Sequence, residues 1–177
     1  MLQIKNNKKK ILELFFDYPM EQFHLRQISR KTGIAVTSVR KYLDELIKEK
    51  LIIKIDKGIY PSFRADRDND NGIFRFYKML NIIERLNSSG LLDYLWDNCH
   101  PNSIILYGST SRGEDIEGSD IDLFVESNEK RLDLSKFEKK LNREIHLFFE
   151  KDFSRLNKQL KNNIANGILL KGYLNIF

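Results

Sequence analysis

The sequence predicts a chain of the α/β class (α+β), with a helical N-terminal part followed by a mixed β-sheet flanked by helices. Two observations predict this class. Apolar residues recur at helical spacing over much of the first 100 residues, and runs with strand-like alternation appear after residue 100. The polar stretch at residues 64–72 is the best candidate for a boundary, so we expect two domains.

Three helices are predicted before residue 51. The first covers residues 7–17, where apolar side chains form a helical stripe. The second covers residues 24–31 and ends near Gly33, because glycine suits the left-handed residue that follows a helix. The third covers residues 36–50, with its apolar side chains on one face and its charged ones largely outward.

A β-hairpin is predicted next. Two β-prone runs, residues 51–55 and 59–63, are joined by a glycine-containing connector at 56–58. Three helices and a hairpin, with a Thr-Gly-Ile turn between the second and third helices, resemble the winged helix-turn-helix family over residues 7–64. The resemblance implies a winged helix-turn-helix DNA-binding domain at residues 1–66.

In that family the second helix of the motif enters the major groove through its N-terminal residues, while the wing touches phosphates. The resemblance therefore implies double-stranded DNA as a partner, and paired half-sites would suit a homodimer. Two alternatives stay open: a solvated helix face without DNA contact, and a protein-binding winged helix. The matching positions are Thr37, Ser38, Arg40 and Lys41 on the third helix and Lys57 on the wing.

The charge distribution agrees with a polyanion partner. Residues 1–70 hold 15 Lys and Arg against 10 Asp and Glu, whereas residues 71–177 hold 15 of each. The whole net charge of +5 therefore belongs to the first 70 residues. The alternative is a basic surface that only keeps the protein in solution.

Composition excludes several classes of protein. No stretch approaches the roughly 18 uninterrupted apolar residues of a membrane span, so we expect no membrane partner. Cys99 is the single cysteine, which excludes an intrachain disulfide and favours a reducing compartment. The histidines His24, His100 and His146 lack the spacing of a zinc site. We expect a cytoplasmic protein.

After residue 72 the pattern predicts helices and strands in alternation, as expected of a sheet flanked by helices. A final strand at the edge of this sheet is expected to close the chain. The predicted helices are 73–86, 91–99, 134–141 and 152–166, the last capped by Asp152, and the predicted strands are 103–107, 120–126, 144–150 and 167–174.

The segment 106–125 carries the most informative motif. A strand runs into Gly108-Ser109, and a second strand begins with Asp120 and Asp122. Side chains two apart on a strand share a face, so both carboxylates can hold divalent ions, with Mg²⁺ or Mn²⁺ favoured by oxygen ligands. Gly108 lets a phosphate approach the backbone. The N–H groups at Ser109 and Thr110, expected to start a short helix, and the Arg112 side chain can bind that phosphate.

This motif, Gly-Ser, ten residues and Asp-x-Asp, resembles the signature of the DNA polymerase β nucleotidyltransferase superfamily, and most closely its minimal members related to kanamycin nucleotidyltransferase. The resemblance covers about residues 100–150 and implies a polymerase β-like nucleotidyltransferase domain at 73–177. It implies that Gly108 and Ser109 hold the phosphates of a nucleoside triphosphate (NTP), with ATP the expected substrate. It also implies that Asp120 and Asp122 are catalytic metal ligands.

The family's third carboxylate, on a neighbouring strand, is where this sequence departs from the pattern. Ile145-His146-Leu147 stands where an apolar-Asp-apolar triplet is usual. Glu144, two residues earlier on the same strand face, could substitute, and His146 could itself ligate a softer metal or act as a base. A partly buried, hydrogen-bonded histidine is the other reading. Glu144 and His146 are therefore candidate catalytic residues.

The sequence thus predicts a nucleotidyltransferase that transfers a nucleoside monophosphate from an NTP to a hydroxyl acceptor with two divalent metals, coupled to a DNA-binding domain. The alternative is a DNA-binding transcriptional regulator whose degenerate nucleotidyltransferase domain senses a nucleotide or dimerises. A toxin–antitoxin setting is a third hypothesis, with a protein hydroxyl or a toxin partner as acceptor.

Overall fold

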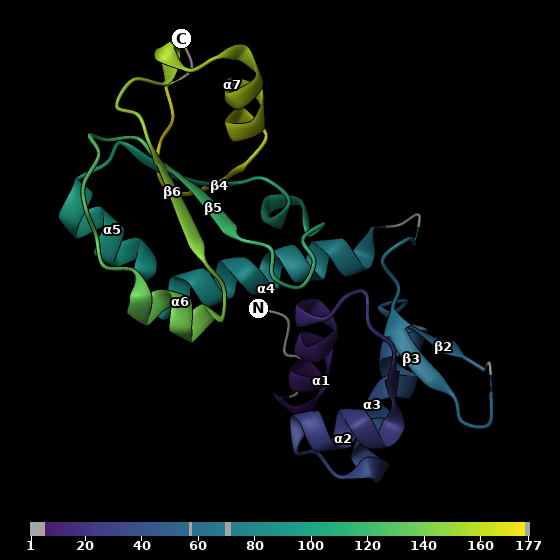
Figure 1. Cartoon of the computed structure of the whole chain (residues 1–177). Helices are drawn as coiled ribbons and strands as arrows, with labels where there is room; N and C mark the ends of the chain where they lie inside the picture. Colours follow the sequence, from purple (N-terminus) through teal and green to yellow (C-terminus); the bar gives the residue numbers. More distant parts are fainter. Residues whose placement is uncertain (1–5, 57, 70–71, 176–177) are drawn as a thin grey trace. The chain divides into compact units, whose positions relative to one another are not determined.

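The computed structural model describes residues 6–56, 58–69 and 72–175. These residues form a mixed α/β fold with helices and two β-sheets, which confirms the predicted fold class (Figure 1). The chain divides into two compact units, Met1–Lys78 and Met79–Phe177. In the part of the chain that the structure describes, no helix has both the length and the apolar character needed to cross a membrane.

Three helices form the core of the first unit, as predicted. The apolar side of each helix is buried in one cluster, to which Phe15, Ile28 and Leu43 contribute fully buried side chains. Gly33 ends the second helix at φ 70°, and its N–H donates to the Ser29 carbonyl at 2.8 Å. The helices are α1 (Asn6–Asp17), α2 (Leu25–Thr32) and α3 (Val36–Lys48).

An antiparallel sheet completes this unit, in the order β1-β3-β2. The predicted hairpin is present, but its second strand lies further along the chain than expected. Ile59 and Tyr60 stay outside the sheet and are 91% and 73% exposed, while Ala65 pairs with Ile52 and is fully buried. The predicted polar linker 64–72 therefore begins too early, because tertiary pairing extends the strand over Arg64 and Ala65. The strands are β1 (Phe23–His24), β2 (Ile52–Ile55) and β3 (Ser62–Ala65).

Two helices follow, close to their predicted bounds. Helix α4 (Ile73–Ser89) begins within the first unit, where Phe74 is buried, and α5 (Leu91–Cys99) lies in the second unit. Gly90 separates them and adopts φ 83°. Helix α4 therefore runs three residues beyond its predicted end at residue 86.

The second unit contains a mixed sheet in the order β6-β5-β4-β7 (Figure 1). Strands β5 and β6 are parallel, with α6 between them in the sequence, and the other pairs are antiparallel. Strand β7 is an edge strand, as predicted. The elements are β4 (Ser103–Tyr107), β5 (Ile121–Val125), α6 (Ser135–Leu141), β6 (Ile145–Phe149) and β7 (Ile168–Gly172).

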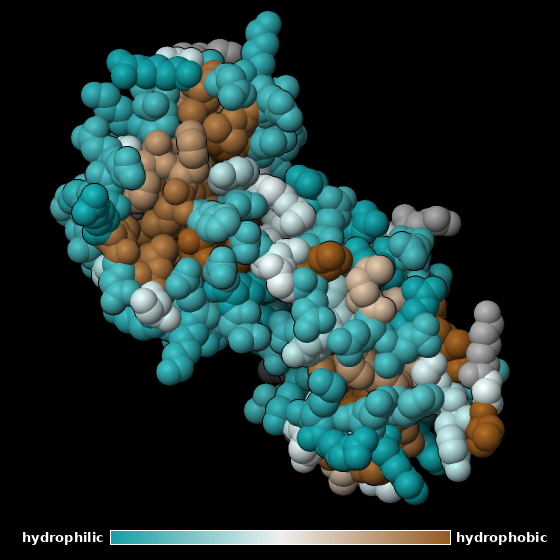
Figure 2. All heavy atoms as spheres, viewed as in Figure 1, coloured by the Kyte–Doolittle hydropathy of each residue, from teal (hydrophilic) through white to brown (hydrophobic). Residues whose placement is uncertain are grey.

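The two faces of this sheet differ. On one face Leu106, Leu123 and Ile145 pack with apolar residues of α5 and α6. On the other face Phe124 packs near Phe148 and the C-terminal segment. Figure 2 shows apolar side chains gathered over the sheet of this unit, among hydrophilic neighbours. The second face is the one on which Asp122 lies, because Asp122 and Phe124 are two residues apart on β5.

The predicted helix from Asp152 to Asn166 is wrong in one respect, because the structure divides it. Asp152 caps a single 3-10 turn, η2 (Phe153–Arg155), by accepting a hydrogen bond from the Ser154 N–H at 2.9 Å. Leu156 is extended, and Asn157 then caps α7 (Lys158–Ala165) by accepting from the Leu160 N–H at 2.9 Å. Two capping residues five apart each begin their own helix, which interrupts the longer one.

Candidate active site

The turn after β4 lies against the second aspartate. Gly108 adopts φ 75°, and a Cβ atom built on it would lie 2.5 Å from Asp122 Oδ2. A side chain at this position would therefore be strained by the backbone and would collide with the carboxylate. Ser111 Oγ donates to the Gly108 carbonyl at 2.8 Å and fixes the turn. The Gly-Ser turn and the Asp-x-Asp strand thus meet, as the sequence predicts.

The helix expected at Ser109 and Thr110 is only one 3-10 turn, η1 (Thr110–Arg112). Its macrodipole is small, so phosphate binding here would depend on individual N–H groups and not on a helix end. Thr110 is fully buried, and its Oγ1 donates to the Asp120 carbonyl at 2.9 Å. This bond ties the turn to the first aspartate as well.

Strand β6 brings two more candidate ligands beside the aspartates. Asp122 is the register partner of His146, and the Ile121 N–H donates to the Glu144 carbonyl at 2.9 Å. His146 Nδ1 lies 3.5 Å from Asp120 Oδ2 and 3.9 Å from Asp122 Oδ1. Asp120, Glu144 and His146 each present a ligand atom within 4.8 Å of the others. The four side chains that the sequence singles out are therefore neighbours on two adjacent strands.

The electrostatics of this cluster favour a cation. Burial raises the pKa of Asp122; the nearby His146 lowers it and Asp120 raises it again. Burial likewise raises the pKa of Tyr107, and the Asp122 charge adds to this shift. Because burial and like charge oppose ionisation of Asp122, a divalent ion would relieve this cost. The donor set, carboxylate oxygens with one imidazole, fits a divalent ion.

Arg112 forms an ion pair with Glu114. Its Nε donates to Glu114 Oε2 at 2.8 Å, and its side chain is half exposed. The Glu114 N–H in turn donates to the Ser109 carbonyl at 3.0 Å. Arg112 is thus held next to the Gly-Ser turn by an ion pair, and its contact with a phosphate stays a prediction.

Three residues near the site were missed by sequence reasoning. Tyr107 is the register partner of Asp122 on β4, a pairing that depends on β4 and β5 being neighbours and that alternation within one strand does not indicate. Asp115 and Arg143 form a buried ion pair, with Nη1 and Oδ2 2.5 Å apart. The pair anchors the 113–119 loop to the segment that precedes β6. Residues 28 positions apart give no local signal of such a pairing.

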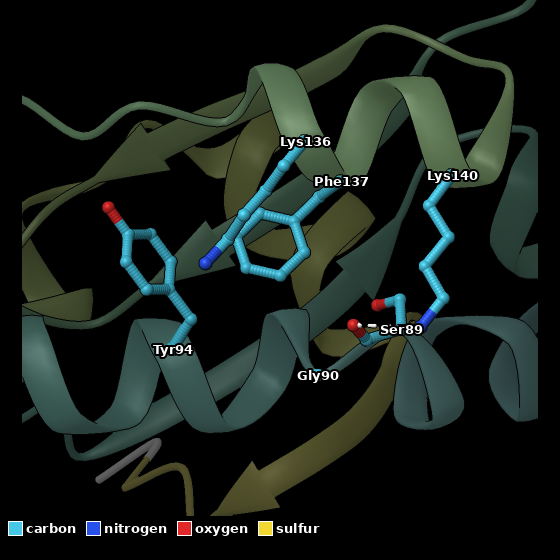
Figure 3. A pocket seen from close by; sticks show the side chains of 6 residues that line it. All are labelled: Ser89, Gly90, Tyr94, Lys136, Phe137 and Lys140. Atoms are coloured by element: carbon cyan, nitrogen blue, oxygen red, sulfur yellow. Dashed lines mark hydrogen bonds between the residues drawn. The ribbon is translucent and has the colours of Figure 1, made fainter.

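A separate pocket of about 330 Å³ lies among the helices of the same unit (Figure 3). Lys136 Nζ lies 4.9 Å from the centroid of the Tyr94 ring and 4.6 Å from that of Phe137. Lys140 Nζ donates to the Ser88 carbonyl at 2.8 Å. Phe137 belongs to the core on the helical face of the sheet, so this pocket is on the face opposite Asp122.

The predicted DNA-contacting residues lie on α3. Thr37, Arg40 and Lys41 are exposed and Ser38 is half-buried, whereas Val39 is fully buried in the core. The N-terminal half of α3 therefore presents a polar, basic face to solvent. Lys57 lies outside the described residues.

Comparison with known proteins agrees with this site. The family model described as "Nucleotidyltransferase domain" matches residues 91–170, from α5 to β7, and so includes the Gly-Ser turn and all four clustered side chains. No curated protein matches the chain. The match supports the expected polymerase β-like assignment in its general form, because residues 91–170 are similar to the nucleotidyltransferase domain family.

Proposed function

We propose that the protein transfers a nucleoside monophosphate from an NTP to a hydroxyl acceptor, with two divalent metals, and that a DNA-binding domain is coupled to this activity. The proposed domains are residues 1–66, a winged helix-turn-helix, and 73–177, the nucleotidyltransferase. One observation carries the proposal: the Gly108 turn approaches Asp122 so closely that a Cβ would lie 2.5 Å from Oδ2. A phosphate held at the turn would thus lie beside the metal-binding carboxylates.

Each residue has a proposed role in the reaction. Gly108 and Ser109 would hold the phosphates through the turn backbone, with Arg112 nearby, and Asp120 and Asp122 would hold the ions, Mg²⁺ or Mn²⁺. When bound, these ions neutralise the charge of the triphosphate. The acceptor oxygen forms a bond to the α-phosphorus, and the bond from the α-phosphorus to the bridging oxygen breaks, releasing pyrophosphate. The hydroxyl proton would pass to Glu144, which lies in the cluster.

The first unit supports DNA binding through α3. Arg40 and Lys41 are exposed at the N-terminal half of this helix, and the excess positive charge of the chain belongs to residues 1–70. Thr37 and Ser38 would contact base edges, and Lys57 on the wing would contact phosphate. A homodimer would place two such helices on paired half-sites.

A DNA-binding regulator with a degenerate transferase domain is the alternative function. It is favoured by His146, which occupies the position opposite Asp122 where the family pattern has a carboxylate. However, Glu144 and His146 both lie within 4.8 Å of Asp120 ligand atoms, so the site retains a third and a fourth ligand. This proximity favours the nucleotidyltransferase over the regulator.

A toxin or another protein hydroxyl as acceptor is a further hypothesis, which co-purification from the native host would test.

Calorimetry and pyrophosphate release test the proposed function. We expect Mg²⁺-dependent NTP binding by the full chain, with ATP tried first, and its loss in the Asp120→Ala/Asp122→Ala double variant. Removal of both carboxylates should lower kcat by at least about 100-fold, the scale seen when transition-state charge stabilisation is removed. Asp97→Ala, at an exposed position of α5, is the control. Undiminished metal-dependent affinity in the double variant would contradict the site.

A further inference from the structure

We propose that His146 is a nitrogen ligand of the divalent-ion site and that this ligand makes the site prefer Mn²⁺ to Mg²⁺. The inference rests on the proposed function, since it concerns the same site. It goes further by assigning the fourth side chain of the cluster and the identity of the ion. It concerns the one position at which this chain departs from the carboxylate pattern of the resembling family.

The sheet places the imidazole where a ligand is needed. Strands β5 and β6 are parallel with Asp122 opposite His146, so the two side chains are one strand spacing apart, about 4.8 Å, on the same face. His146 Nδ1 faces both aspartates, at 3.5 Å from Asp120 Oδ2 and 3.9 Å from Asp122 Oδ1. Adjacent ligands of an octahedral ion with bonds of about 2.1 Å lie about 3 Å apart. Small side-chain rotations would bring these atoms to that separation.

The rest of the cluster supplies oxygen ligands on the same side. Asp120, Glu144 and His146 present ligand atoms within 4.8 Å of one another, and each is partly exposed. Glu144 thus keeps a third carboxylate near Asp120, although the position opposite Asp122 holds an imidazole. This cluster supplies two carboxylates and one nitrogen, and Asp122 adds a third carboxylate whose Oδ1 lies 3.9 Å from His146 Nδ1.

This donor set discriminates between the two ions. Mg²⁺ is bound in proteins almost entirely by oxygen and keeps several waters, whereas transition metals accept imidazole readily. Replacing a carboxylate by a neutral ring also removes one negative charge, which weakens Mg²⁺ binding most because its bonds are largely electrostatic. Mn²⁺ stands between the two groups: it accepts carboxylate, water and imidazole. The site should therefore bind Mn²⁺ more tightly than Mg²⁺.

Pulsed electron paramagnetic resonance on the full chain loaded with Mn²⁺ alone tests the nitrogen bond directly. We expect hyperfine coupling to one directly bound ¹⁴N nucleus in the wild type and its loss in both His146→Ala and His146→Asp. His100→Asn is the matched control, since His100 is exposed at φ 48° and asparagine tolerates that conformation. The control should keep the coupling. Thermal melts of each variant establish that it folds.

Competition between the ions provides the second measurement. Mg²⁺ should displace Mn²⁺ from the wild type only at a large excess. In His146→Asp the ratio of the two dissociation constants should move toward Mg²⁺ by at least the roughly tenfold that loss of even an outer-shell partner costs. Mn²⁺ binding without nitrogen coupling, or coupling that survives in His146→Ala, would overturn the inference and leave the proposed function standing. No binding of either ion by the wild type would overturn both.

Discussion

Gly108 and Asp122 are packed so closely that a single methyl group cannot be added between them. The Cβ that alanine would carry lies 2.5 Å from Asp122 Oδ2, and the backbone of Gly108 has φ 75°. We therefore expect Gly108→Ala to displace the Asp122 carboxylate from the site. NTP binding in the presence of metal should fall at least about tenfold, because misplacement of a ligand by even 1 Å is costly. Calorimetry measures this loss.

Gly118→Ala separates the two effects of that substitution. Gly118 has nearly the same backbone, φ 77°, but no atom lies within 4 Å of a Cβ built on it. Both alanine variants should lose about 1–2 kcal/mol of stability from the left-handed backbone. Only Gly108→Ala should lose nucleotide affinity, and equal affinity losses in the two variants would refute a specific contact between the turn and Asp122.

Loss of the buried ion pair between Asp115 and Arg143 should lower the stability of the protein by a large amount. Their side chains are 3% and 8% exposed, and Asp115→Asn would leave the Arg143 charge buried without its carboxylate partner. We expect a loss of about 3–5 kcal/mol in the unfolding free energy of the second unit. Urea unfolding followed by the fluorescence of Trp96, the single tryptophan, reports on this unit.

Asp93→Asn is the matched control for this ion pair. Asp93 Oδ1 lies 2.7 Å from Lys171 Nζ, but its side chain is 76% exposed. Exposed pairs contribute at most about 1 kcal/mol. If the two variants lost similar amounts of stability, burial would not be what makes the Asp115–Arg143 pair important.

Sequence periodicity was sufficient to predict most elements of the fold. It was insufficient where an element depends on competing caps or on pairing between strands. The strand alternation that places Asp120 and Asp122 on one face is local, and so is the glycine that ends α2. The division of the last predicted helix at Leu156 and Asn157 depends on two competing caps, and the late start of β3 depends on its pairing with β2. Local patterns do not decide between such alternatives.

The same distinction applies to the candidate site. The Gly-Ser and Asp-x-Asp motifs are close in sequence, so their meeting could be predicted. The register that sets His146 opposite Asp122 and Tyr107 on the other side depends on which strands are neighbours. The resemblance to a family indicated the position of His146, whereas nothing in the sequence indicated the Asp115–Arg143 pair.

The buried carboxyl group of Glu126 should make the stability of the protein depend on pH. This glutamate is buried, and Ser103 Oγ donates to its Oε2 at 2.8 Å. Burial raises its pKa, the hydrogen bond from Ser103 lowers it, and the Asp152 charge raises it. A carboxyl whose pKa is raised by folding binds more protons in the folded state. Its contribution to stability is therefore fully present at low pH and is lost as the pH rises from the ordinary glutamate range, about 4.3, through the folded value.

Glu126→Gln should abolish this dependence, since the amide oxygen still accepts from Ser103 and cannot ionise. Urea unfolding at a series of pH values should show the variant gaining stability relative to the wild type as the pH rises, and then a constant difference. Glu129→Gln, at an exposed position three residues away, should show no such trend. A constant difference over the whole pH series would contradict the role assigned to burial.

The basic face of α3 predicts how DNA affinity depends on salt. Arg40 and Lys41 are exposed near the N-terminal end of the helix, while Lys48 is exposed at its C-terminal end. Each side chain that neutralises a phosphate adds about 0.9 to the slope of log affinity against log salt. Lys41→Ala should reduce the slope of double-stranded DNA binding by about that amount for any sequence, whereas Lys48→Ala should leave it unchanged.

Arg40→Ala separates base reading from phosphate binding, because removing a side chain that reads a base would cost about 1–3 kcal/mol of binding free energy only on the preferred sequence. Fluorescence anisotropy over a range of salt concentrations measures all three variants, and equal slopes for all of them would show that α3 does not enter DNA by its N-terminal half.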